Sequence, residues 1–461
     1  MRTTSLVFAL AATLAVTWVG EREARACGGC FHPPTESNSV ITDHRMVLSV
    51  SKTRTTLYDQ IQYQGSPSEF AWVLPINGEA TVGLSADALF AMLDGMTATV
   101  VEAPDLGCPA QPADCLTGLR ASAPKSADES AGGGVTVTKH EVVGPYETVQ
   151  LKSSDPQALN AWLATNGFAV PEDVRPIIKA YVNERSDFLA LKLRPGANIK
   201  SMRPVRVTTA GGSPVLPLRM VAAGTGAKVG ITLWVLGEGR YQPRDFPNFQ
   251  ILDSELVWDW SNQTSNYKDL RARRGADGKS WETESSVTLQ AKAVANAVRY
   301  GYFGGGSFGG APPQASSDYE PSTDAEGRVL KTADQVREED LEVLLSDLTT
   351  LRATRLRADL AHAALATDLA LQPSADQAEL PGLRKAKGEL GQPMCTVYNG
   401  CQADGQLPRD QAIARSSTRF GCSASPVTTE ASLSLVTLAG FLGYAFIRSR
   451  RRGNKGTPPC A

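Results

Sequence analysis

Histidine and net charge are both scarce in this sequence. Its 461 residues include 4 histidines, and the formal net charge at pH 7 is −2. No H-E-x-x-H motif occurs, so the sequence gives no support to a histidine-based metal centre, and we expect no cofactor. A nearly neutral chain also has no general attraction for nucleic acid.

Charge is absent altogether from residues 431–447, which read ASLSLVTLAGFLGYAFI. As a helix this stretch would rise about 26 Å, close to the thickness of a bilayer core. Arginines at 448 and 450–452 follow directly, and positive charge resists translocation out of the cytoplasm. The stretch therefore predicts a single transmembrane helix, a membrane partner and a basic cytoplasmic tail. A buried core helix is the alternative, although such a helix would carry a polar stripe.

The N-terminus predicts export. Arg2 precedes an apolar run from Leu6 to Val19, and residues 24–26 (Ala-Arg-Ala) carry small residues at the spacing that signal peptidase cleaves. The mature chain would begin at Cys27, and acylation of that cysteine as a lipoprotein is the alternative. The two ends together predict a single-pass protein of the cell membrane with its bulk outside the cytoplasm.

The eight cysteines fit an exported chain that is stabilised by disulfides. Cys460 would be cytoplasmic, which leaves an odd number outside. Because closing a short loop loses the least entropy, we expect sequence neighbours to pair. The expected bridges are Cys27–Cys30, Cys108–Cys115 and Cys395–Cys401, and the remaining Cys422 is a candidate for processing or lipidation.

Two short motifs have the form of catalytic sites. Residues 27–30 match C-x-x-C, which forms a structural disulfide, a redox pair or, together with Cys395 and Cys401, a zinc site. No strand precedes the motif, so the structural disulfide is favoured. Residues 304–310 match both G-x-S-x-G and G-x-G-x-x-G, but Pro312 and Pro313 prevent the helix that either site needs. We therefore assign no catalytic, cofactor-binding or metal-binding residue.

Hydrophobic periodicity predicts an α+β fold of mainly antiparallel strands with a few helices, a long C-terminal helix and the transmembrane helix. Alternating stretches at 188–193 and 229–235 predict strands, and 57–63 with 70–74 predict a hairpin. The aromatic stretch with Trp258, Trp260, Tyr267 and Trp281 either plugs the core or lines a carbohydrate or peptide groove. The expected organisation is a signal peptide at 1–26, an exported α+β domain at 27–303, a Gly/Pro/Ser-rich linker at 304–332, a long amphipathic helix at 333–371, a Cys-bearing polar segment at 372–430, the transmembrane helix at 431–447 and the basic tail at 448–461.

Several of these segments occur in the order typical of one family. They include residues 27–31 (CGGCF), 70–75 (FAWVLP), 188–193 (FLALKL), 265–267 (SNY) and 351–371. The chain thereby resembles the exported bacterial proteins grouped as domain-of-unknown-function family 2330. That resemblance implies an exported domain without an assigned reaction. The C-terminus also resembles a myxobacterial C-terminal sorting signal, which implies processing and surface display.

The sequence thus favours a membrane-anchored envelope or surface protein with a binding or structural role, displayed on the cell surface if the C-terminus is processed. Other envelope proteins or glycans are the expected partners. An envelope enzyme, either a hydrolase or a thiol-redox protein, is the alternative.

Overall fold

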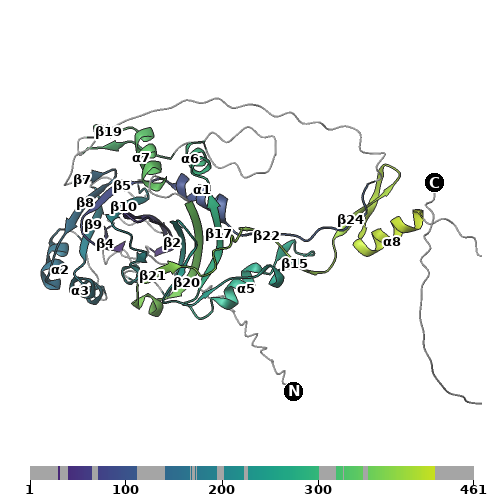
Figure 1. Ribbon diagram of the computed structural model, residues 1–461, viewed down its shortest axis with the longest axis horizontal. Helices are drawn as coiled ribbons and strands as arrows, with labels where there is room; N and C mark the ends of the chain where they lie inside the picture. Colours follow the sequence, from purple (N-terminus) through teal and green to yellow (C-terminus); the bar gives the residue numbers. More distant parts are fainter. Residues whose placement is uncertain are drawn as a thin grey trace, which may run out of the picture.

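Two β-sheets stacked face to face form the body of the protein, and an arm extends from one end of this body (Figure 1). The structure is a computed structural model that describes residues 30–31, 40–64, 71–111, 141–166, 168, 172, 174–194, 202–222, 227–300, 318–324, 327–345 and 351–420.

The larger sheet has eight strands in the order β14-β17-β20-β12-β2-β3-β10-β5. The β12–β2 and β14–β17 pairs are parallel, and its other pairs are antiparallel. The central strand β12 has the sequence KVGITLWVLG, whose β-branched and apolar residues suit a strand that is covered on both faces. The bounds are β14 Asn248–Phe249, β17 Trp281–Leu289, β20 Leu351–Ala361, β12 Lys228–Gly237, β2 Val40–Val50, β3 Arg54–Gln64, β10 Val205–Ala210 and β5 Ala80–Leu84.

The smaller sheet has five strands in the order β1-β4-β9-β8-β7, all antiparallel. Alternate residues of its central strands face opposite layers, as the period of a strand requires. Trp72 and Leu74 of β4 pack toward the larger sheet, whereas Val73 between them packs under helices α2 and α3. The bounds are β1 Cys30–Phe31, β4 Ala71–Ile76, β9 Asp187–Leu193, β8 Tyr146–Leu151, β7 Glu141–Val143, α2 Pro156–Thr165 and α3 Arg175–Asn183.

Helices cover the outer face of the larger sheet as well. Helix α1 (Asp87–Thr97) contacts β17 and β20, α7 (Ala333–Leu345) contacts β5, and α6 (Ala291–Tyr300) contacts both helices. The body therefore has four layers, with helices outside and the two sheets inside. Smaller elements complete it: β11 Val215–Leu216, α4 Leu218–Val221, β13 Tyr241–Pro243, β18 Ser322–Thr323, β19 Val329–Lys331, η4 His362–Ala366 and β21 Leu369–Pro373.

The contact between the larger sheet and its helices is charged at both ends. Paired residues form one row across the sheet, Arg355–Trp234–Val47–Tyr58–Arg206–Gly83. At one end Arg355 and Arg45 lie 5.1 and 5.3 Å from the Trp234 ring, and both guanidinium groups pair with Asp94 of α1. At the other end the buried Arg206 pairs with Asp340 and Glu339 of α7. These ion pairs fix where each helix sits on the sheet.

The arm consists of residues 100–111, 251–266 and 382–420. Three separate parts of the chain run side by side in it, because β6 (Val100–Glu102) pairs with β22 (Leu383–Lys385) and β15 (Val257–Asp259) pairs with β23 (Gly388–Leu390), both in parallel. A hairpin and a helix form its far end (Figure 1). The remaining bounds are η3 Asp253–Glu255, β16 Thr264–Ser265, β24 Met394–Asn399, β25 Gln402–Pro408 and α8 Arg409–Phe420, and α5 Tyr267–Arg274 lies at the root of the arm.

The long C-terminal helix predicted for 333–371 is wrong. Helix α7 ends at Leu345, and β20 follows from Leu351 between β17 and β12. Leucine, arginine and alanine favour helices locally, but Leu356, Ala358 and Leu360 alternate with charged residues and bury one face of a strand. Burial in the sheet overrides the local preference.

The predicted hairpin of 57–63 with 70–74 is also wrong. The first segment, in β3, pairs with β2 and β10, whereas the second, in β4, pairs with β9 in the other sheet. Both faces of β4 are buried, one against each neighbouring layer, so this strand belongs in the smaller sheet.

The expected fold class is contradicted in its membrane helix. None of the helices among the described residues is long and apolar enough to cross a membrane. The stretch 431–447 itself lies outside those residues, as do residues 1–26, predicted as a signal peptide, and residues 448–461, predicted as a basic tail.

Candidate functional site

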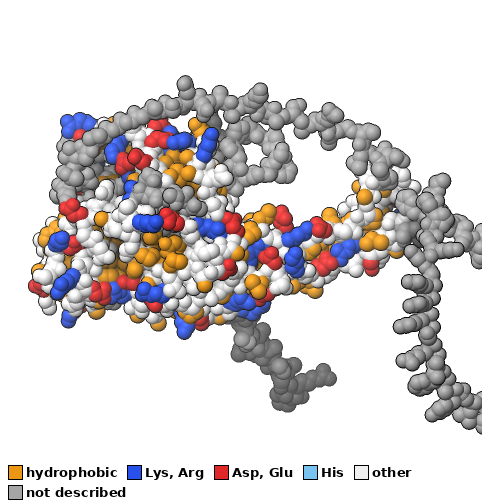
Figure 2. All heavy atoms as spheres, in the orientation of Figure 1, with side chains coloured by type: hydrophobic (Ala, Val, Ile, Leu, Met, Phe, Trp, Pro, Cys, Tyr) orange, Lys and Arg blue, Asp and Glu red, His pale blue; other side chains and the backbone are white. Residues whose placement is uncertain are grey.

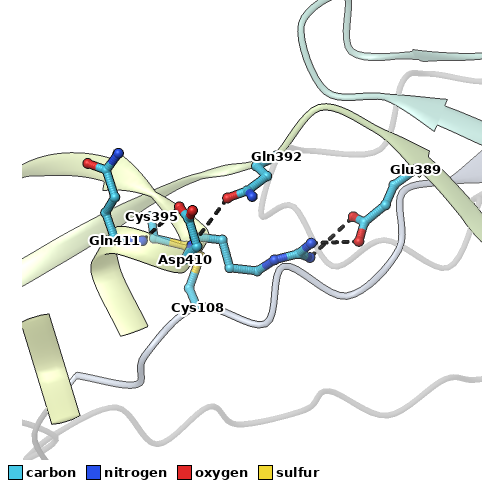
Figure 3. Close-up of a disulfide and its surroundings, with 7 residues drawn as sticks. Cys108, Glu389, Gln392, Cys395, Asp410 and Gln411 are labelled. Atoms are coloured by element: carbon cyan, nitrogen blue, oxygen red, sulfur yellow. Dashed lines mark hydrogen bonds and ion pairs between the residues drawn. A yellow bond between two sulfur atoms is a disulfide. The ribbon is translucent and has the colours of Figure 1, made fainter. Parts of the chain in front are cut away.

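A disulfide between Cys108 and Cys395 closes the far end of the arm (Figure 3). The two cysteines are separated by 287 positions in the sequence, and their Cα atoms lie 5.4 Å apart. The predicted bridges Cys108–Cys115 and Cys395–Cys401 are therefore wrong, and Cys401 is disulfide-bonded as well. Short loops close most easily, but the parallel pairing of β6 with β22 places the two distant segments side by side in the folded protein.

Polar contacts surround this disulfide. The Arg409 guanidinium donates to both carboxylate oxygens of Glu389, at 2.6 and 3.2 Å, and the Trp260 indole N–H donates to the same carboxylate at 2.8 Å. Hydrogen bonding from Arg409 lowers the pKa of Glu389. The Asp410 backbone N–H donates to Gln392 at 3.2 Å (Figure 3). Beneath these contacts Cys395 packs with Val397, Ala412 and Leu407, so the disulfide staples a small core of its own.

Most of the large apolar side chains that the described chain exposes belong to the arm. Leu383 and Val100 are register partners on β22 and β6, with exposed fractions of 59% and 54%. Apolar side chains recur along the arm between charged ones (Figure 2). The set comprises Val100, Leu106, Leu252, Leu383, Leu390, Met394 and Ile413. Exposed apolar groups gathered in one region are typical of a binding surface.

A second polar site lies between the two sheets. Asp59 on β3 approaches His44 on β2, with 3.4 Å between His44 Nδ1 and Asp59 Oδ1, and their exposed fractions are 1% and 4%. A cavity of about 20 Å³ adjoins this pair, with apolar walls that include Trp72, Leu216 and Met220. A cavity of that volume has room for about one water molecule. It therefore has no room for a substrate in this conformation.

The third site is a pair of buried carboxyl groups on β17. Glu282 and Glu284 are 1% and 2% exposed, and both lie within hydrogen-bond distance of the Tyr267 hydroxyl on α5. Burial, and then the charge of Glu284, raise the pKa of Glu282 to about 7. Arg355 on β20 pairs with Glu284. An acid with a raised pKa beside an ion-paired carboxyl group is a pattern found at catalytic sites, but a substrate cannot reach groups this deeply buried.

The residues that the sequence analysis singled out lie in separate parts of the structure. The aromatic residues pack rather than line an open groove: Trp281 is fully buried, Trp260 is 7% exposed, and the Trp258 and Trp260 rings meet edge to face at 6.3 Å. Cys30 lies on β1, opposite Trp72 of β4. The described residues contain no group of three or more histidine, cysteine, aspartate or glutamate side chains that could hold a metal ion. Cys27, Cys115, Cys422 and the glycine-rich stretch 304–310 lie outside the described residues.

Sequence reasoning missed both buried polar sites. The His44–Asp59 pair joins residues fifteen positions apart, and only the register of β2 with β3 brings them together. For the carboxyl pair a signal was present, because Glu282 and Glu284 alternate within an otherwise uncharged strand, WETESSVTL. Charged residues at alternate positions of a fully covered strand indicate a buried polar cluster.

Comparisons with known proteins identify the family without naming a reaction. Among solved structures, baculovirus P35 aligns at 13% sequence identity over 44% of this chain and 66% of the viral protein, with a TM-score of 0.24. That score is too low for the likeness to bear on fold or function. No curated protein matches the sequence. The family described as "Uncharacterized protein conserved in bacteria (DUF2330)" matches residues 22–300, which is more than half of the chain. The chain therefore belongs to DUF2330, a conserved bacterial family.

Proposed function

We propose that this bacterial protein is exported to the cell envelope and acts there by binding, with the arm as its contact surface and envelope proteins or glycans as its partners. The Cys108–Cys395 disulfide is the observation that carries the proposal. Such bonds form and persist in oxidising compartments and are rare in the bacterial cytoplasm. A binding role requires no cofactor.

The distribution of apolar and polar groups supports binding over catalysis. The arm exposes its apolar side chains to solvent, whereas the two polar clusters of the body are enclosed. His44 adjoins a cavity of about 20 Å³, which holds about one water. A surface that is exposed and held rigid by a covalent link binds a partner without a large loss of conformational entropy.

A secretion experiment tests the compartment. We would express the full chain in bacteria with its own N-terminus and, in parallel, without residues 1–26, and map disulfides in each product without reduction. The proposal expects the Cys108–Cys395 peptide in the envelope or exported fraction of the first culture and free thiols in the second. Recovery of the first product from the cytoplasm with both thiols free would contradict export.

Crosslinking in intact cells tests the surface. A photoreactive amino acid at Leu390 on the arm, 61% exposed, should give discrete adducts with envelope proteins or glycans. The same group at Lys179, exposed on α3 at the opposite side of the body, is the matched control. Equal adduct patterns from both positions, or adducts from Lys179 alone, would refute a binding role for the arm.

An envelope hydrolase is the second candidate, and the carboxyl pair favours it, because the raised pKa of Glu282 lies beside Glu284, which is ion-paired with Arg355. It requires the root of the arm to open, since both groups are buried. Glu284→Gln should then abolish hydrolysis of a panel of glycoside and ester substrates by the purified protein. A panel that gives no turnover with the wild-type protein would remove this candidate.

A further inference from the structure

Two buried carboxyl groups share one phenol at the root of the arm. The Tyr267 oxygen lies 2.9 Å from Glu282 Oε1 and 3.2 Å from Glu284 Oε1. A phenol carries one hydrogen, so it can donate to only one of these oxygens. If both carboxyl groups were ionised, the second contact would join two oxygen atoms without a hydrogen between them. The geometry therefore calls for one additional proton on a carboxyl group.

The charges around the pair place that proton on Glu282. Glu284 accepts from Arg355 Nε at 2.5 Å and lies 3.6 Å from Arg357 Nη1, so two cationic groups face this carboxyl group. By contrast, Glu282 Oε2 is buried and has no hydrogen bond, and its nearest cationic nitrogen is Arg271 Nε at 3.6 Å.

The other charged groups near Glu282 are already engaged. Arg271 donates to Asp359 at 2.6 Å, and Arg357, the register partner of Glu282 on β20, pairs with Glu284 instead. Arg384 of β22 donates to backbone carbonyl oxygens, including that of Glu284 at 3.0 Å. Protonated Glu282 can donate to the Tyr267 oxygen, which then donates to Glu284.

We propose that Glu282, Tyr267 and Glu284 form a proton-sharing chain that locks the root of the arm and releases it when the proton leaves. The leaving proton passes to solvent, and two buried carboxylates then compete for one phenolic hydrogen. Repulsion between them weakens the hold of β17 on α5. The proposal does not depend on what the arm binds.

The arm is attached to the sheet at this pair. The backbone carbonyl of Glu284 accepts hydrogen bonds from Arg384 of β22 and from the hydroxyl of Thr99. Thr99 directly precedes β6. Tyr267 and Leu270 of α5 also pack in the apolar cluster at the base of the arm, with Ile251 and Leu256. A shift of β17 or α5 would therefore reach β6, β15 and β22 together.

The proton should leave near neutral pH. Burial, followed by the charge of Glu284, raises the pKa of Glu282 to about 7. Because the pKa is higher in the locked form than in the open form, locking is strongest at low pH and is lost as pH rises through about 7. With an ordinary value of 4.5 in the open form, protection at the root should fall roughly 50- to 100-fold between about pH 5 and pH 8.

Hydrogen–deuterium exchange of the full chain tests this lock. Protection of the α5, β6 and β22 amides, corrected for intrinsic exchange, should fall with rising pH in the wild type. Glu282→Gln replaces the acid with an amide that can donate to Tyr267 at any pH, so its protection should change less than about 5-fold over the same range. Glu342→Gln is the matched control, because Glu342 is exposed on α7, and it should follow the wild type. Equal pH dependence in the wild type and Glu282→Gln would overturn the proposal.

Infrared spectroscopy supplies a second readout that detects the proton itself. At pH 6 the wild type should show a carboxylic-acid carbonyl band that is missing from Glu282→Gln and retained in Glu342→Gln. If Glu282→Gln does not fold, Tyr267→Phe decides, because loss of the phenol should shift that band. A wild-type spectrum without such a band, or a band that Tyr267→Phe leaves in place, would overturn the proposal.

Discussion

Removing the disulfide at the end of the arm should destabilise the whole body. The bond closes a loop of 287 positions, which includes most of both sheets. Loop-closure entropy for that length predicts about 5 to 6 kcal/mol of stabilisation at 25 °C, acting through the unfolded chain. Measured losses from native disulfides are smaller, about 2 to 5 kcal/mol. We therefore expect Cys108→Ser combined with Cys395→Ser to lower the free energy of unfolding by about 2 to 5 kcal/mol.

Urea unfolding of the oxidised wild type and the double variant measures this difference, and peptide mapping verifies that the other disulfides are unchanged. Arg409→Gln is the control, because it removes the neighbouring ion pair with Glu389 but keeps the covalent link. An exposed ion pair contributes at most about 1 kcal/mol. Limited proteolysis should also cut the double variant first at β24, β25 or α8, whose small core loses its staple. Equal unfolding free energies of the double variant and the wild type would refute the reasoning.

Three further predictions concern the body and the root of the arm. Gly83→Ala would place a Cβ 2.4 Å from the Arg206 guanidinium, which the ion pair with Asp340 holds in place. The free energy of unfolding, measured by thermal unfolding, should therefore fall by about 2 to 3 kcal/mol. An unchanged melting temperature would show that the Arg206 side chain can move aside. Arg206→Met should lower the free energy of unfolding, measured with urea, by about 3 to 5 kcal/mol, because it leaves the Asp340 carboxylate buried without its cation. A loss below about 1 kcal/mol would show that Asp340 takes up a proton at little cost in free energy. Above pH 7.5, Glu282→Gln should raise the free energy of unfolding by about 3 kcal/mol relative to the wild type, and below pH 5 the two proteins should be nearly equal in stability. Urea unfolding across this pH range measures the difference. A stability gain of equal size at both ends of the range would contradict the proton assigned to Glu282.

The stability that Glu282 contributes changes with pH in the opposite direction to that of an ordinary ion-paired carboxylate. Its pKa in the folded protein lies above the ordinary value of 4.5, so its contribution to stability is complete at low pH and disappears as pH rises through about 7. Glu339, whose pKa is lowered by Lys331 and Arg206 against the opposing effect of burial, contributes in the other direction and loses its contribution in acid. The pH dependence of single variants therefore separates the two groups.

The sequence by itself determined the elements whose pattern is local. The alternation at 188–193 and 229–235 predicts strands, and the structure has β9 and β12 there. In each case the burial of one face follows from the period of the chain, which is the same in every context. The family resemblance rested partly on the segment 188–193, and the family match over residues 22–300 confirms the family.

Only the tertiary structure decided how distant segments meet. Residues 351–361 have helical preferences but form the strand β20, because they pair with β17 on one side and with β12 on the other. Cys108 pairs with Cys395 because β6 and β22 run side by side, and Asp59 reaches His44 across the β2–β3 register. Each of these contacts depends on which strands become neighbours. That choice reflects the summed burial of both sheets and their helices, a quantity that no short window of sequence contains.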